Sequence, residues 1–281
     1  MVSHDVKVVA TDAAATDYFG EIRSCAGVSS SAFAVGAYHD DDMGSDSGAA
    51  YVFTNNSGSW VQAEKLLVSD GASSDYFGRT MAALSQSTLA ISSFFDDDMG
   101  SDSGSIYLFT KNNDSWAQSD KLTASDGASS DYFGYGCAGL SSSILVVGSY
   151  YDDDDGSQSG SAYIFTSNSG GTWVQADKVL ASDGASLDYF GNQVSKLSNS
   201  SFVVSAYGDD DEGSYSGATY VFTSYAGSWL QSDKIVPSDV AAGDVFGFGI
   251  SDLSSQKFVA SSYNDDCCGS SNLGSAYVFS Q

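Results

Sequence analysis

The sequence predicts an all-β fold made of five repeated units. The dipeptide Phe-Gly recurs along the whole chain with a period of about 57 residues, and no stretch shows the sustained spacing of apolar residues that indicates a helix. The five copies begin at Phe19, Phe77, Phe133, Phe190 and Phe246. Units of four short strands repeated at such a period are typical of a β-propeller, in which each unit forms one blade.

Within each unit, four segments read as strands. In the third unit they cover about 133–140, 143–151, 161–166 and 172–181, and they are rich in β-branched and aromatic residues bounded by Gly, Ser, Asn or Asp. We therefore expect one propeller domain over residues 1–281. Its repeats are predicted at about 11–68, 69–124, 125–181, 182–237 and 238–281, with an additional N-terminal strand at 1–10.

The two ends of the sequence predict how the ring closes. The chain reaches the third strand of the fifth unit with "SAYVFSQ", and it begins with "HDVKVVATD", which is similar to the fourth-strand segment "QSDKLTASD". A closed ring hides the edges of its first and last strands. We expect the N-terminal strand to complete the last blade.

Composition supports a folded domain. With 42% hydrophobic and 13% aromatic residues in 281, the chain has enough apolar material for a packed core. No apolar run is long enough to cross a bilayer, and the first ten residues lack the charged start and apolar centre of a secretion signal. Either the chain is cytosolic or a signal peptide has been removed.

The formal net charge of −26 is concentrated in two connections of each unit. These are the loop between the second and third strands, such as "YYDDDDGSQSG", and the connection to the next unit, such as "SDGASSDYFG". Successive strands run antiparallel, so both connections emerge on one face, whereas the opposite face is mostly Ser, Asn and Gly. A merely solubilising surface would scatter its acids. Such an acidic face also argues against nucleic acid as a partner.

Crowded carboxylates favour a bound cation. Two like charges about 5 Å apart repel by roughly 1 kcal/mol even in water, and calcium is the hard, oxygen-binding cation best suited to compensate them. The ordinary alternative is that Asp, Ser and Gly simply form turns. The fifth loop, "YNDDCC", is the weakest candidate. The predicted metal ligands are Asp40, Asp42, Asp70, Asp75, Asp96, Asp98, Asp126, Asp131, Asp152, Asp154, Asp183, Asp188, Asp209 and Asp211.

The repeat resembles a known family. Phe-Gly followed by "LVVGSY" or "FAVGAY" and then by "YVF" is similar to the FG-GAP repeat of integrin α-chain propellers and many microbial surface proteins. The resemblance covers all five units and implies a cell-surface or extracellular setting. Integrin propellers have seven blades, however, and their calcium loop lies between the first and second strands, where this chain has only turns such as "LSSSI". The family's calcium ligands therefore cannot be transferred by position.

Several other residue sets recur or stand out. Possible glycosylation acceptors lie on the face opposite the acids, at Asn55, Asn113 and Asn199. Recurring tyrosines are expected to pack between blades; these are Tyr51, Tyr107, Tyr163, Tyr220 and Tyr277. Recurring lysines are expected to protect an outermost strand edge; these are Lys7, Lys65, Lys121, Lys178 and Lys234.

The cysteines and the aromatic residues before the acidic loops carry open alternatives. Cys25 and Cys137 are expected to be buried thiols. Cys267 and Cys268 could form a vicinal disulfide, cross-link another chain or stay free. Exposed aromatic side chains at the start of each acidic loop could stack on sugars; these are Tyr38, Phe95, Tyr151 and Tyr207.

Catalysis has little support in the sequence. The chain has only two histidines, His4 and His39, and no Ser/His/Asp or Cys/His arrangement can be assembled. Five near-identical loops suit multivalent binding instead. We therefore expect a non-enzymatic extracellular or cell-surface module whose calcium-binding acidic face mediates adhesion to, or assembly with, a protein or matrix partner. The alternative is a multivalent lectin with one sugar site per blade. We expect no membrane insertion.

Overall fold

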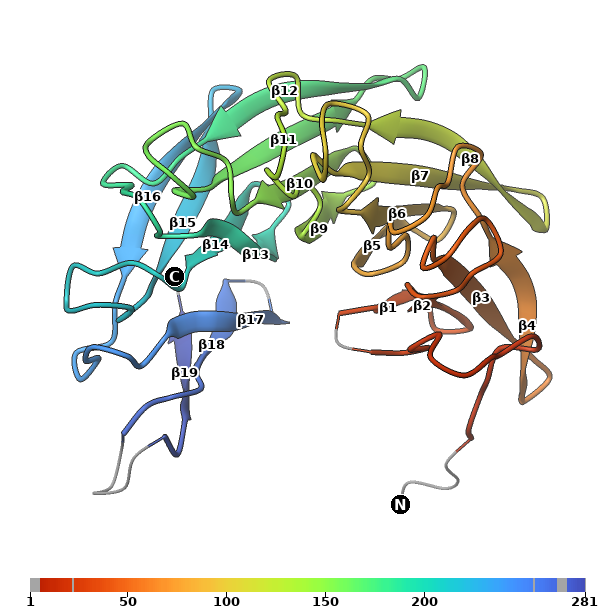
Figure 1. Cartoon of the computed structure of the whole chain (residues 1–281), viewed down its shortest axis with the longest axis horizontal. Helices are drawn as coiled ribbons and strands as arrows, with labels where there is room; N and C mark the ends of the chain where they lie inside the picture. The colour runs from red at the N-terminus through yellow and green to blue at the C-terminus, as the bar shows by residue number, and fades with distance from the viewer. Residues whose placement is uncertain (1–5, 22, 255, 267–271, 281) are drawn as a thin grey trace.

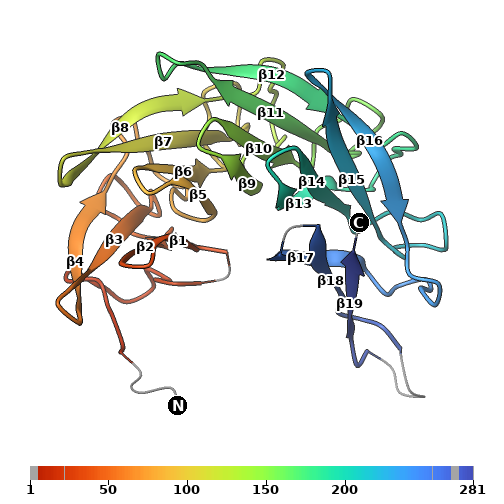
Figure 2. The ribbon, with the colours of Figure 1, turned by 180° about the vertical axis from the view of Figure 1, so that it is seen from behind.

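The computed structural model describes residues 6–21, 23–254, 256–266 and 272–280. Within them there is no helix, and accordingly none that is long and apolar enough to span a membrane. The strands form five antiparallel sheets arranged radially about a common axis (Figures 1 and 2). The predicted all-β propeller with five blades is confirmed.

Four blades have four strands each, in simple meander order. Blade one contains β1 (Cys25–Ser29), β2 (Ala32–Ala37), β3 (Ala49–Asn56) and β4 (Ser59–Leu66); blade two contains β5 (Met81–Ser85), β6 (Thr88–Ser93), β7 (Ser105–Asn112) and β8 (Ser115–Leu122). Blade three contains β9 (Gly136–Ser141), β10 (Ile144–Ser149), β11 (Ser161–Ser167) and β12 (Trp173–Val179); blade four contains β13 (Phe190–Ser198), β14 (Ser201–Ala206), β15 (Ala218–Tyr225) and β16 (Ser228–Ile235).

Blade five has three strands, β17 (Phe246–Ser254), β18 (Lys257–Ser262) and β19 (Ser275–Ser280). The expected closure by the N-terminal strand is therefore wrong for the part of the segment that the structure describes. Residues 6–10 form no strand. Val8 and Ala10 pack against blade one instead, beside Val35, Tyr51 and Phe53. This packing anchors the segment to blade one, and Figure 1 shows the N-terminal trace and β19 on two sides of an opening in the ribbon.

The core lies between neighbouring blades. The middle strands are almost entirely buried, and one core cluster joins Val52 and Leu66 of blade one to Ile91 and Tyr107 of blade two. The Phe of each Phe-Gly pair packs edge-on against the third-strand tyrosine of the blade that it opens, as for Phe77 and Tyr107 with ring centroids 5.8 Å apart. The innermost strands pack in sequence, β1 on β5, β5 on β9, β9 on β13 and β13 on β17. This arrangement lines a central channel with the first strand of each blade.

The glycines before the acidic loops allow neighbouring blades to approach closely. A Cβ added to Gly148 would lie 1.9 Å from the carbonyl oxygen of Gly191 in the next blade, and a Cβ on Gly36 would lie 1.8 Å from that of Gly78. No other residue fits at such a distance. In blades one and three the backbone of the second strand therefore packs directly on that of the next Phe-Gly pair, whereas the equivalent position is a serine in the other blades.

Candidate functional site

The two acidic connections are joined by backbone hydrogen bonds on one face of the molecule. In blades one and two, the amides of Ser74, Tyr76 and Phe77 donate to the carbonyls of Ser45, Asp46 and Ser47 at 2.8, 3.2 and 3.0 Å. The same pattern recurs between the later blades. This ladder fixes each acidic loop against the connection that opens the next blade.

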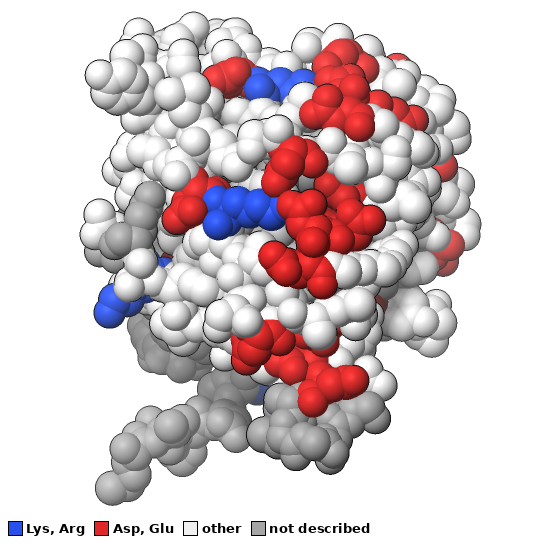
Figure 3. Space-filling view, turned by 90° about the vertical axis from the view of Figure 1, so that its left-hand side faces the viewer, with Lys and Arg blue, Asp and Glu red and all other residues white. Residues whose placement is uncertain are grey.

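A lysine ammonium lies at the centre of the carboxylates in each of the first four blades. In blade two, Lys121 Nζ lies 2.9 Å from Asp70, 2.9 Å from Asp96 and 2.6 Å from Asp98. Lys65, Lys178 and Lys234 repeat this geometry with distances of 2.6–3.0 Å. Figure 3 shows basic side chains flanked by acidic ones on both sides. We call each such group, one lysine with its three aspartates, a lysine cluster.

Strand pairing explains why the lysine reaches this position. Lys121 on β8 pairs across the strand with Tyr107 on β7, and the same Tyr–Lys pair occurs in blades one, three and four. The Tyr107 hydroxyl donates to Asp96 at 2.7 Å, and Lys121 Nζ lies 4.9 Å from the centre of the Tyr107 ring. Cation–π attraction adds to the ion pairs. These four tyrosines are completely buried, whereas Tyr277 of blade five is partly exposed. The lysines do more than protect an edge.

The electrostatics of a lysine cluster favour the charged forms. Burial by itself lowers the pKa of Lys121, but its hydrogen bonds to Asp98, Asp70 and Asp96 outweigh burial and raise it above its ordinary value. Burial likewise raises the pKa of Asp70, and the bond to Lys121 more than reverses this, leaving it lowered. Because Asp96 is only 3% exposed, its charge depends on the ammonium for compensation.

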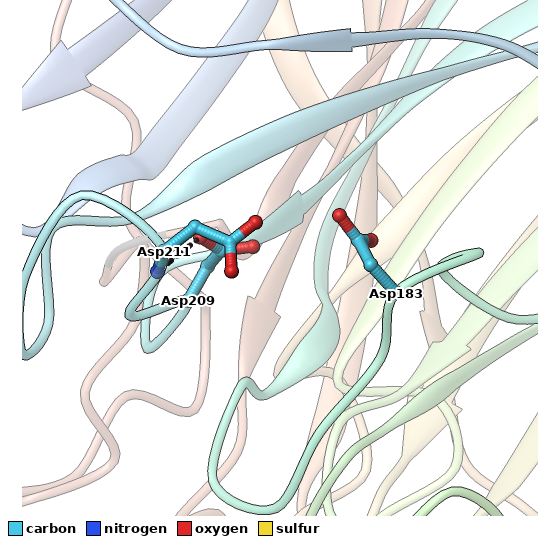
Figure 4. Close-up of side chains that lie close together, drawn as sticks. All are labelled: Asp183, Asp209 and Asp211. Atoms are coloured by element: carbon cyan, nitrogen blue, oxygen red, sulfur yellow. Dashed lines mark hydrogen bonds between the residues drawn. The ribbon is translucent and has the colours of Figure 1, made fainter.

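Eleven of the fourteen predicted metal ligands thus belong to lysine clusters. These are Asp40, Asp42, Asp70, Asp96, Asp98, Asp126, Asp152, Asp154, Asp183, Asp209 and Asp211, and the twelfth carboxylate, Asp12, was not among the predicted ligands. Asp183, Asp209 and Asp211 also have oxygens close enough to share a metal ion, and Figure 4 shows Asp209 and Asp211 pointing toward Asp183 across the gap between two connections.

The other three predicted ligands close turns in the connections that open the blades. Asp75, Asp131 and Asp188 each accept a hydrogen bond from the backbone amide three residues earlier, at 2.7, 2.7 and 2.9 Å, and so close a turn. Burial raises the pKa of all three to about 6; the backbone bond opposes this and the aspartates of the neighbouring loop add to it. Their role matches the turn-forming alternative.

Aromatic rings form a continuous chain around the same face. Neighbouring ring centroids lie 4.9–5.9 Å apart along the whole series, which links all five blades. The series is Tyr18, Tyr38, Tyr76, Phe95, Tyr132, Tyr151, Tyr189, Tyr207, Phe248 and Tyr263. The four aromatic residues predicted to stack on sugars are thus partly buried members of this chain.

The cysteines differ in part from expectation. Cys25 is exposed and Cys137 is partly buried, and both border the central channel because they lie on the innermost strands. Cys267 and Cys268 lie outside the described residues. Asn113 and Asn199 are exposed in turns on the face opposite the lysine clusters, and Asn55 lies near the end of β3 on that side.

The fold and its repeated clusters define a β-propeller repeat protein. The FG-GAP repeat model matches residues 2–53, 60–109, 116–165, 173–222 and 229–279, and the chain belongs to the FG-GAP repeat family. No curated protein matches the sequence. A solved structure of a candidate 6-phosphogluconolactonase from Bacteroides uniformis is similar in fold, with a TM-score of 0.52 and 10% identity, over 89% of this chain and 64% of that one. At this identity the likeness concerns the fold alone.

Proposed function

We propose that this chain is a non-enzymatic binding module of the cell surface or extracellular space, and that its acidic face contacts a positively charged protein or matrix partner. The supporting observation is the excess of carboxylates on a face whose backbone is held rigid. Each lysine cluster contains three carboxylates and one ammonium. Further acids beside the clusters stay exposed, namely Asp41, Asp97, Asp153 and Asp210. Such a field attracts cationic surfaces and speeds association with them.

Neutralising these exposed acids tests the proposal. Asp41 and its three counterparts would be changed to Asn, which still accepts the loop hydrogen bond that Asp41 receives from the Asp46 amide at 2.8 Å. Retention of protein-coated beads on cells or matrix should fall at least about fivefold and should be salt-sensitive. A control changes Asp114, which is exposed in the turn between β7 and β8, away from this face. Equal retention of both variants would exclude the acidic face as the contact surface.

Calcium was the cation expected for this face. It does not fit inside the four lysine clusters, because the ammonium nitrogen already lies 2.6–3.0 Å from the same oxygens that would coordinate the metal. Any calcium that this face binds must use other carboxylate oxygens. The melting temperature should therefore change by less than about 2 °C between excess EDTA and millimolar calcium. A calcium-dependent rise of several degrees would show that metal orders the loops.

A lectin is the second candidate, and the continuous chain of aromatic rings favours it. Tyr and Phe faces stack on the apolar faces of sugars. A glycan array, with and without chelator, separates the two functions. Sugar binding that is lost when Tyr151 is changed to Ala supports the lectin, whereas silence across the array leaves the acidic face as the functional surface.

A further inference from the structure

Both arginines of the chain lie at one mouth of the central channel. Arg23 lies two residues before β1 and Arg79 two residues before β5, so both lie near the start of an innermost strand. The channel has a volume of about 630 Å³ and is lined by the first strand of every blade. This volume lies within the range of about 300–1,000 Å³ that is common for small-molecule sites.

Arg23 reaches across the mouth to three other blades. Its Nη1 donates to the carbonyl of Asn192 and its Nη2 to that of Phe248, both at a long 3.4 Å. Its Cζ lies 5.3 Å from the centre of the Tyr135 ring and 6.0 Å from that of Phe248. The guanidinium therefore stands between aromatic faces, with two weak hydrogen bonds and further donors to spare.

No carboxylate among the described residues forms an ion pair with the Arg23 guanidinium. The nearby carboxylate of Glu21 accepts a hydrogen bond from Tyr38 instead. Burial lowers the pKa of Arg23, the ring of Tyr135 opposes this, and the like charge of Arg79 lowers it further. A partly buried cation without a neighbouring anion is energetically unfavourable. A bound anion would therefore stabilise the Arg23 guanidinium.

The side-chain nitrogen of Asn192, a residue whose backbone contacts Arg23, also lacks a hydrogen-bond partner within the described part of the chain. Asn192 is 1% exposed, and its side-chain Nδ2 has no hydrogen-bond acceptor among the described residues. Its carbonyl is the one that receives the bond from Arg23. Buried amide donors are almost always satisfied in folded proteins.

The tyrosines around the arginine narrow the class of ligand. The rings of Tyr135 and Tyr150 pack with centroids 4.3 Å apart and planes tilted by 38°, and Tyr207 lies at the same mouth near Phe248. Burial raises the pKa of Tyr150 and Tyr207, so their hydroxyls remain protonated hydrogen-bond donors. Aromatic faces suit the apolar faces of a sugar ring, and the guanidinium fork matches a carboxylate.

We infer that the central channel mouth binds a carboxylate-bearing sugar of the uronic acid class, with Arg23 on its carboxylate and Tyr135, Tyr150 and Tyr207 around its ring. This site lies on the same face as the lysine clusters, because Tyr207 belongs to the chain of aromatic rings there, but none of its residues belongs to a lysine cluster. Binding at the mouth and contact through the acidic loops are therefore tested by different variants.

Calorimetric titration with galacturonic acid, and with galactose as the matched neutral sugar, tests the inference. We expect galacturonic acid to bind with a dissociation constant in the roughly millimolar range or tighter, and galactose at least about tenfold more weakly. Arg23→Gln should reduce affinity for galacturonic acid at least about tenfold. Lys111→Gln, on the face opposite the lysine clusters, should leave it unchanged.

The melting temperature of Arg23→Gln shows whether a loss of binding results from unfolding. Because Arg23 has no ion pair, Arg23→Gln should melt within a few degrees of the unchanged protein. Tyr135→Phe should weaken binding less than Arg23→Gln, since it keeps the ring. Absence of galacturonic acid binding, equal binding of galactose, or equally tight binding of inorganic phosphate would each overturn the inference.

Discussion

Blades one to four and blade five each bury one aspartate of the acidic loop, yet they differ in what compensates its charge. In blade two the buried Asp96 meets both a tyrosine hydroxyl and an ammonium. In blade five the corresponding Asp265 meets Tyr277 at 3.0 Å, and no lysine reaches it among the described residues. The lysine comes from the fourth strand, which the fifth sheet lacks.

The missing strand also leaves apolar surface uncovered. Tyr107 is completely buried under β8, whereas Val278 on β19 is 66% exposed. The outermost strand of a blade thus has two functions. It covers the third strand, and it delivers the cation that the loop needs.

The largest expected effect comes from removing a cluster lysine. Lys121→Met leaves the buried Asp96 and its two neighbours without a counterion, and it should lower the free energy of unfolding by about 3 kcal/mol. Lys257→Met, at an exposed position of β18, is the matched control and should change it by less than about 0.5 kcal/mol. Urea denaturation measures both. A loss for Lys121→Met no greater than the control's would mean that the clusters do not stabilise the fold.

Removing the tyrosine hydroxyl should have a smaller effect that differs between blades. Tyr107→Phe removes a buried hydrogen bond to a carboxylate and should cost about 1–3 kcal/mol. Tyr277→Phe removes a partly exposed one and should cost less than about 1 kcal/mol. Equal losses in thermal or urea unfolding would contradict the difference between the blades.

The pH dependence of stability should reveal the turn-closing aspartates. Asp75, Asp131 and Asp188 have a pKa of about 6 in the folded state, above the value of about 4 in the unfolded chain. Between these values the folded state binds more protons, so the free energy of unfolding should fall as pH rises from about 4 to about 6. Asp131→Asn should reduce that slope by about a third.

The cluster aspartates act in the opposite direction at lower pH. Asp70, Asp126 and Asp183 have a lowered pKa because of their lysines, although burial opposes it. Their contribution is complete above about pH 4 and is lost as pH falls further. Thermal melts from pH 3 to 8 should therefore show a maximum on the acidic side of neutrality. A stability that rises steadily up to pH 7 would contradict the raised values.

The smallest effect is expected at Lys7, which matches the cluster lysines in sequence but is exposed in the structure. Lys7→Met should change the free energy of unfolding by less than about 0.5 kcal/mol. A loss close to that of Lys121→Met would show that Lys7 reaches Asp265, and that the N-terminal segment completes blade five after all.

The sequence allowed the fold to be predicted more fully than the site. The period of Phe-Gly and the alternating strands around Tyr107 or Tyr163 were sufficient for the five blades, because these signals are local. The convergence of carboxylates was also predictable, since antiparallel strands return to the same face. The counterion was not, because Lys121 meets Asp70 only through the pairing of β7 with β8 and the position of the preceding connection. The signal that could have revealed it was the equal period of the lysines and the acidic loops.

Arg23 shows a second limit of sequence interpretation. It occurs in one unit only, so repetition gives it no prominence, and its contact with Phe248 joins residues 225 positions apart in the sequence. Cys25 was misjudged for a related reason: the innermost strand looks like a core strand in sequence, but it borders an open channel.

The lysine at the centre of each cluster supplies the positive charge that the acidic loop needs, and this charge is a covalent part of the protein. Such a charge cannot be diluted, chelated or exchanged. We therefore expect a surface built this way to keep its shape in calcium-poor water, in brackish water and beside calcium-sequestering polymers, where a metal-ordered propeller would loosen.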